Sequence, residues 1–253
     1  MTEPAVIICR DADDLAPQAA AQFVSLAANA AIRSSRFTVA LSGGSTPRAL
    51  YSLLAAPAFK DRIDWRRIHF FWGDERCVPP DHSESNYRMV HEALLSKIEI
   101  PPENIHRMAG EKEPQLAASE YEDELRRTFQ LTHGQVPRFE LILLGLGEDG
   151  HTASLFPGSA ALDETNHLVA TAYVEKLKAH RLTLTLSVIN AASQVSFLVS
   201  GASKSAVVKQ ILGATPARPD YPAARINPAN GSLTWFIDAA AAAGLRAARD
   251  KAI

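Results

Sequence analysis

The chain has 253 residues, of which 47% are hydrophobic and 21% charged, as is typical of a soluble globular protein with a substantial core. A formal net charge of −2 argues against nucleic acid or another polyanion as a partner, so any bound anion should be small. The two cysteines, Cys9 and Cys77, form no C-x-x-C pattern, which argues against a disulfide scaffold or a thiolate zinc site.

The apolar runs give no sign of secretion or membrane insertion. Glu3 comes early, and the apolar run over residues 5–9 is too short for a secretory signal. No uninterrupted apolar stretch approaches the roughly 20 residues that span a bilayer. We therefore expect a cytoplasmic protein that binds neither membranes nor nucleic acid.

Short runs of β-forming residues alternate with helical segments along the chain. Strands are expected over residues 37–41, 68–72, 140–144, 182–186, 195–199 and 233–237. Helices are expected over residues 47–55, 116–129, 204–212 and 238–249. The strict alternation of residues 182–186 predicts a half-exposed strand. The overall alternation favours an α/β fold, with a mostly parallel, Rossmann-like sheet covered by helices on both faces.

The chain shows no internal repeat and no linker. The Pro-rich stretch over residues 216–228 is interpreted as an ordered loop, because strand-like and helical sequence follows it. We expect residues 1–253 to form a single α/β domain, as a monomer or a weak homodimer.

A glycine-rich segment follows the first predicted strand, where ligands bind in parallel sheets. It comprises Ser42, Gly43, Gly44, Ser45, Thr46 and Pro47. Thr46 is expected to cap the following helix and Pro47 to occupy its first position. Free N–H groups and hydroxyls at a helix N-terminus form a natural phosphate cradle. An ordinary strand–turn–helix connection is an equally open interpretation, and the spacing is not that of a Walker P-loop.

Charged residues follow the second predicted strand. Asp74 is expected to orient a substrate hydroxyl, and Arg76 to bind a phosphate group. The alternative is a solvated loop with a local ion pair.

The third strand end carries Asp149 and His151 among glycines. Residues 145–150 match G-x-G-x-x-G, but a dinucleotide site also needs a sustained helix, and Pro157 stops any helix after about two turns. What remains is a carboxylate that can fix the imidazole tautomer, beside glycine N–H groups that can approach an oxyanion. This setting favours a functional histidine over a structural one.

Two further cations are candidates for an anion site. Lys204 follows the glycine turn after the strand over residues 195–199. A cation in the first turn of a helix is disfavoured by the helix dipole, so its presence there indicates a bound anion. Arg181 opens the alternating strand and is a weaker candidate. Both can equally be surface residues.

Together these segments closely resemble the 6-phosphogluconolactonases of the pentose phosphate pathway. The resemblance covers nearly the whole chain in order, and its most specific part is Asp-Gly-His-Thr-Ala-Ser-Leu-Phe-Pro-Gly at residues 149–158. Other matching segments are residues 42–47, 72–76, 85–87, 181–183 and 201–204, with Trp235. The resemblance implies a fold shared with glucosamine-6-phosphate isomerase/deaminases, and hydrolysis of 6-phosphogluconolactone to 6-phosphogluconate without a metal or other cofactor.

The resemblance also implies roles for the candidate residues. His151 is then the catalytic base, while residues 42–46, Arg76 and Lys204 surround the phosphate group, with Arg181 as a second-rank candidate.

Two rival functions differ in specific features. The related isomerase/deaminases carry a glutamate before the proline of this segment, where the present chain has Phe156, which cannot move protons. A non-catalytic sugar-phosphate sensor would usually carry a DNA-binding element, and no basic helix-turn-helix segment is visible. The sequence therefore favours the lactonase.

Overall fold

A seven-stranded parallel sheet forms the centre of the computed structural model, which describes residues 3–33, 36–175, 178–213 and 220–245. The strand order is β1-β10-β9-β6-β2-β3-β5. The strands are β1 (Ala5–Cys9), β2 (Phe37–Leu41), β3 (Ile68–Trp72), β5 (Ile105–His106), β6 (Leu141–Leu144), β9 (Gln194–Val199) and β10 (Ser232–Asp238). A second, antiparallel sheet contains β4 (Asp74–Arg76), β8 (Ala179–Leu184) and β7 (Val169–Val174).

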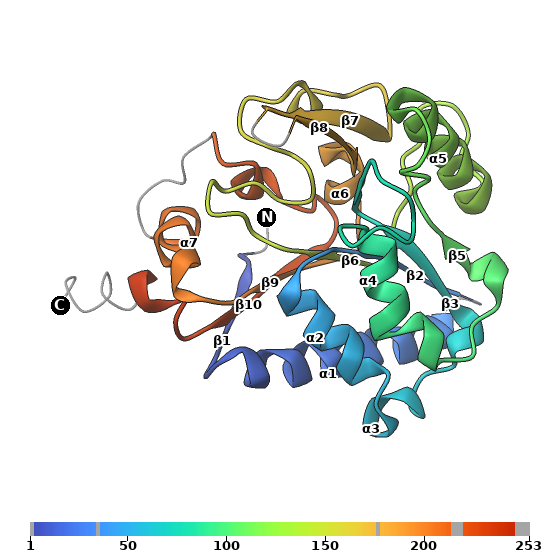
Figure 1. Ribbon diagram of the computed structural model, residues 1–253. Coiled ribbons are helices and arrows are strands. Elements are labelled where there is room, and N and C mark those ends of the chain that lie inside the picture. The colour runs from blue at the N-terminus through green and yellow to red at the C-terminus, as the bar shows by residue number, and fades with distance from the viewer. Residues whose placement is uncertain (1–2, 34–35, 176–177, 214–219, 246–253) are drawn as a thin grey trace.

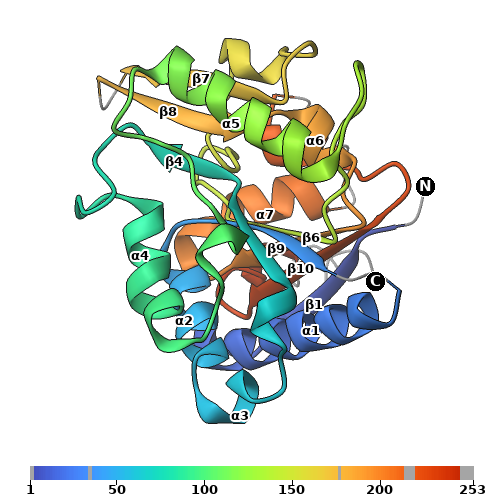
Figure 2. The same ribbon diagram turned by 90° about the vertical axis from the view of Figure 1, so that its right-hand side faces the viewer.

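Helices cover both sides of the main sheet, as the sequence predicts. They are α1 (Ala12–Arg33), α2 (Ser45–Leu54), α3 (Pro57–Lys60), α4 (Asn86–Ala93), α5 (Pro114–Phe129), α6 (Leu186–Asn190) and α7 (Ser205–Leu212). Figures 1 and 2 both show α1 and α2 below the sheet, with α5, β7 and β8 above it. No helix among the described residues is long and apolar enough to cross a membrane.

The central strands are buried on both faces. Every residue of β2, β6 and β9 is buried, as expected for parallel strands between helical layers. The core includes stacked rings of Phe197 and Trp235, whose centroids lie 3.8 Å apart on neighbouring strands. Because these strands are parallel, their carboxyl ends lie at the same edge of the sheet.

The predicted half-exposed strand over residues 182–186 is wrong in its length and its exposure. β8 ends at Leu184, and Leu186 begins α6. Thr183 is fully buried because the strand is covered on both faces, and its hydroxyl accepts a hydrogen bond from the Ser154 N–H at 3.3 Å. The alternation of leucine and threonine therefore reflects a buried threonine with hydrogen-bond partners, not a solvent face.

The predicted helix over residues 238–249 is also wrong where the structure describes it. Asp238 ends β10, residues 239–242 form turns, and helix begins only at residue 243. The carboxylate of Asp238 accepts a hydrogen bond from the Ala241 N–H at 2.7 Å, which favours the turn. Residues 246–249 lie outside the described residues. Of the Pro-rich stretch, residues 220–228 form an ordered loop, and residues 216–219 lie outside the described part.

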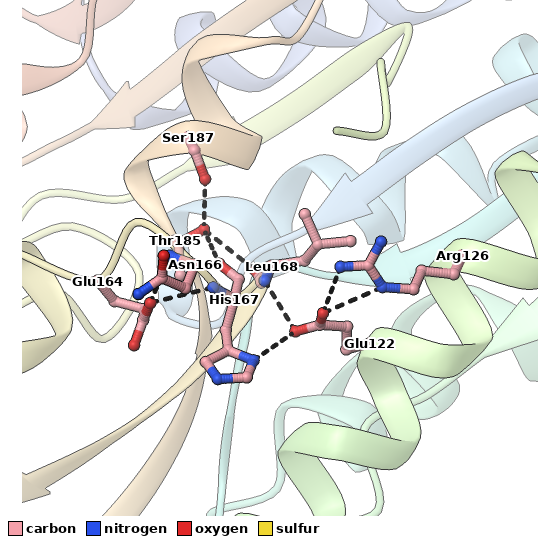
Figure 3. Close-up of polar contacts among 8 residues, drawn as sticks. All are labelled: Glu122, Arg126, Glu164, Asn166, His167, Leu168, Thr185 and Ser187. Carbon is pink, nitrogen blue, oxygen red and sulfur yellow. Dashed lines mark hydrogen bonds and ion pairs between the residues drawn. The ribbon is translucent and has the colours of Figure 1, made fainter. Parts of the chain in front are cut away.

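Glu122 ties α5 to the small sheet (Figure 3). Its carboxylate accepts hydrogen bonds from Arg126 Nη2 at 2.6 Å and from the Leu168 N–H at 2.8 Å. The Thr185 hydroxyl donates to the Leu168 carbonyl at 3.2 Å. Burial disfavours the charged carboxylate of Glu122, but the hydrogen bonds from Arg126 and Leu168 outweigh this effect and lower the pKa of Glu122. The loop that follows His151 is therefore anchored at its far end.

Candidate active site

A cleft of about 440 Å³ opens at the carboxyl ends of β2, β6 and β9 and beside the small sheet. Ten of the eleven candidate site residues line it, namely Ser42, Gly43, Gly44, Ser45, Thr46, Asp74, Arg76, His151, Arg181 and Lys204. The remaining candidate, Asp149, contacts His151 directly. These residues come from five separate segments of the chain, which thus converge on one cleft.

The glycine-rich segment turns from β2 into α2 at Gly44. Gly44 has φ +104° and is the N-cap of a helix that starts at Ser45. The prediction of Thr46 as the cap is therefore wrong by two residues, because the turn uses the positive φ of glycine and no side-chain cap. The N–H groups of Ser45 and Thr46 lie in the first helical turn, where they have no intrahelical acceptor. They remain available to an anion.

A buried tyrosine holds this turn from behind. The Tyr51 hydroxyl donates to the Ser42 carbonyl at 2.9 Å and accepts from the Ser42 N–H at 3.0 Å. On the other side, a side chain at Gly43 would overlap the Asn86 amide. Gly43 is thus needed for the close approach of Asn86, whose Nδ2 donates to the Asp74 carbonyl at 2.9 Å.

The three residues of β4 alternate in direction, so Asp74 and Arg76 face the cleft and Glu75 does not. The Asp74 carboxylate is buried and accepts a hydrogen bond from the Ser154 hydroxyl at 2.8 Å, so this segment is not the solvated loop of the alternative interpretation. Glu75 is buried and accepts from the Asn86 N–H at 2.7 Å, capping α4. Burial raises the pKa of Glu75.

Arg76 and Arg181 are register partners in the antiparallel pair of β4 and β8. Arg181 is buried, and its Nη1 has no hydrogen-bond partner among the described residues. Burial and the neighbouring charge of Arg76 lower the pKa of Arg181. Like charges that face each other across strands are destabilising, so the pair suits an anion bound in the cleft.

Asp149 orients the imidazole of His151. The two atoms Asp149 Oδ1 and His151 Nδ1 lie 2.5 Å apart, and the same oxygen accepts from the His151 N–H at 3.2 Å. Partial burial disfavours the Asp149 carboxylate, but the bonds to His151 prevail and lower the pKa of Asp149. An ionised carboxylate accepts the Nδ1 proton, so Nε2 carries the lone pair that can take a proton.

The tight turn before His151 requires a glycine at position 147. The Gly147 N–H donates to the His151 carbonyl at 2.8 Å. A side chain at Gly147 would overlap both His151 Nδ1 and Asp149 Oδ1. Phe156 packs against the imidazole, with ring centroids 4.5 Å apart. Turns follow Gly150, and not the sustained helix that a dinucleotide-binding site requires.

Lys204 lies in the short 3₁₀ turn Ala202–Lys204 that precedes α7, and not in the helix itself. Gly201 begins this turn with φ +102°, much like Gly44 at the start of α2. The Lys204 ammonium lies 4.0 Å from Glu148 Oε1, and its side chain is 23% exposed. Because this ion pair is long, the Lys204 ammonium can pair with a phosphate group instead.

Among the cleft residues that the sequence did not predict, two hydrogen-bond to Asp74. Asn86 and Ser154 both line the cleft and both hydrogen-bond to Asp74. Each lies inside a segment that carries the family resemblance, and that resemblance is the sequence feature from which they could have been predicted. Their contact with Asp74 depends on the small sheet, which the sequence did not predict.

Comparison with known proteins agrees with this geometry. Residues 10–235 match the family model described as glucosamine-6-phosphate isomerases/6-phosphogluconolactonase. A 6-phosphogluconolactonase of Synechocystis sp. is 46% identical over 210 residues, covering 83% of this chain and 85% of its own. One of Nostoc sp. is 43% identical over 211 residues, with the same coverage.

Solved structures agree as well. The 6-phosphogluconolactonase from Trypanosoma cruzi superposes with a TM-score of 0.84 at 32% identity, covering 96% of this chain and 97% of its own. The chain therefore belongs to the family of glucosamine-6-phosphate isomerases and 6-phosphogluconolactonases.

Proposed function

We propose that this protein hydrolyses 6-phospho-D-glucono-1,5-lactone to 6-phosphogluconate, the lactonase step of the oxidative pentose phosphate pathway. One observation carries the proposal: an Asp149-oriented imidazole shares a single cleft with a helix N-terminus and three cations. The relatives at 43% and 46% identity are 6-phosphogluconolactonases, which supports the same substrate.

The phosphate group binds among Lys204, Arg76 and Arg181, with the N–H groups of Ser45 and Thr46 at the start of α2. The helix dipole and the free N–H groups favour a negative charge there. Asp74 accepts a hydrogen bond from a sugar hydroxyl, which holds the sugar ring beside His151.

His151 Nε2 takes a proton from a water molecule as the water oxygen bonds to the lactone carbonyl carbon. Backbone N–H groups at the cleft or an arginine stabilise the resulting oxyanion. The imidazolium then gives its proton to the ring oxygen as the bond between that oxygen and the carbonyl carbon breaks. The product is a carboxylic acid, which ionises and releases one proton to solvent.

Phe156 favours the lactonase over an isomerase/deaminase. Its ring lies against the imidazole, 4.5 Å away between centroids, and lines the cleft. A phenyl ring cannot exchange protons, whereas isomerisation and deamination need a second proton carrier. It also shields one face of His151 from water.

Replacing Arg181 with methionine tests the phosphate site. We expect the Kd for 6-phosphogluconate to rise about tenfold, because a charged hydrogen bond is lost. The ligand-free variant should be more stable by about 1–3 kcal/mol, because a buried guanidinium group with an unpaired nitrogen is removed. Calorimetry and urea unfolding measure the two quantities. A less stable variant that binds the product normally would show that Arg181 is structural.

A further inference from the structure

Asp238 is a buried carboxylate outside the residues assigned above. It ends β10, is 5% exposed, and uses both of its oxygens. Oδ2 accepts hydrogen bonds from the Ser200 hydroxyl at 2.6 Å and from the Gly201 N–H at 2.9 Å. Oδ1 accepts from the Ala241 N–H at 2.7 Å. Three donors therefore converge on one side chain.

The position of Asp238 follows from the strand pairing. β10 lies beside β9 in parallel register, with Ile237 paired to Val199, so Asp238 stands next to Ser200 at the same sheet edge. Residues 200–204 form the turn that carries Lys204 into the cleft. Asp238 thus binds the first two residues of this turn from behind.

Gly201 makes the turn sensitive to its anchor. Its φ of +102° lies in the left-handed region, and its carbonyl accepts from the Lys204 N–H at 3.1 Å. The hydrogen bond from the Gly201 N–H to Asp238 fixes the orientation of the peptide group at which the turn starts. A rotation there moves the Lys204 backbone, and with it the ammonium group.

A carboxylate can accept all three of these hydrogen bonds, whereas a neutral amide side chain cannot. A buried carboxylate such as that of Asp238 is costly unless its oxygens accept hydrogen bonds. Its stabilisation comes from the three donors. An asparagine would turn its NH₂ group toward Ala241 or toward the Ser200–Gly201 pair, so one donor would face another donor.

We propose that Asp238 is a positioning residue for substrate phosphate, acting by holding the 200–204 turn so that Lys204 reaches the cleft. This inference rests on the proposed function, in which Lys204 binds that phosphate. The other phosphate-binding turn is built in the same way, since Tyr51 holds Ser42 from behind and Gly44 has φ +104°. Each turn therefore has a buried anchor that does not itself touch the ligand.

The test is the affinity of the Asp238→Asn variant for 6-phosphogluconate. We expect its Kd, and the KM for the lactone, to rise about tenfold, while kcat changes less than about threefold, because His151 keeps its contacts. Thr234→Val is the matched control: Thr234 is on the same strand, buried, and hydrogen-bonded to Gln194 at 3.1 Å. It should lose stability and keep the wild-type Kd.

The double variant Lys204→Ala/Asp238→Asn decides whether Asp238 acts through Lys204. We expect it to bind the product no more weakly than Lys204→Ala alone. Fully additive losses, or a wild-type Kd in Asp238→Asn, would overturn the proposal. A wild-type Kd in Lys204→Ala would instead overturn the phosphate role of Lys204.

Ser200→Ala covers the case in which Asp238→Asn does not fold. It removes the 2.6 Å hydrogen bond and leaves the carboxylate its other two donors. Its Kd should rise about threefold. An unchanged Kd in this variant would also count against Asp238.

Discussion

Replacing His151 with alanine is expected to lower kcat by about 10²–10⁴-fold, the usual contribution of a positioned general base. The imidazole is a proton acceptor in the cleft that a neighbouring carboxylate orients, through the 2.5 Å contact between Nδ1 and Asp149. The phosphate-binding groups lie on other segments and stay in place. The Kd for 6-phosphogluconate should therefore change less than about threefold.

Steady-state kinetics and calorimetry on the same preparation separate these two effects. His133→Ala is a suitable control, because His133 is exposed and lies outside the cleft. It should match the wild type in both measurements. If His151→Ala kept a near-normal kcat, His151 would not be the general base.

Replacing Gly147 with alanine is expected to lower kcat by about 10²-fold, although the added group is one methyl. That methyl would overlap His151 Nδ1 and Asp149 Oδ1, so the imidazole must move. A displacement of about 1 Å at a catalytic group is enough for a loss of this size. Overpacking should also lower the free energy of unfolding by about 1–3 kcal/mol.

Gly158→Ala separates displacement of the imidazole from strain in the loop. Gly158 has φ +73°, so alanine is strained there, but the added methyl meets no atom within 4 Å. We expect a loss of stability of about 1 kcal/mol with kcat unchanged. Equal losses of kcat in the two variants would mean that loop stability, and not the position of His151, limits the rate.

The parallel sheet was predictable because buried strands leave continuous apolar runs. The runs at residues 37–41 and 68–72 coincide with β2 and β3. The small sheet was not predictable in this way. β4 has only three residues, all charged, and it forms because it pairs with β8, which is more than 100 residues away in the chain.

The site was predictable at the level of residue types at strand ends. Glycines, His151 and Lys204 follow apolar strands, and parallel strands bring those ends together. The sequence could not indicate that Arg181 faces Arg76, because that pairing depends on the small sheet. The run of alanines after Asp238 predicts a helix there, whereas the hydrogen bonds of Asp238 to Ser200 and Gly201, which follow β9, are non-local and leave no local pattern.

Lactone hydrolysis is tested most directly by following proton release after freshly prepared 6-phospho-D-glucono-1,5-lactone is added to the purified protein. An ammonia assay with glucosamine-6-phosphate runs beside it. We expect one proton per lactone, released far faster than by spontaneous hydrolysis, and no ammonia. Ammonia release without turnover of the lactone would contradict it.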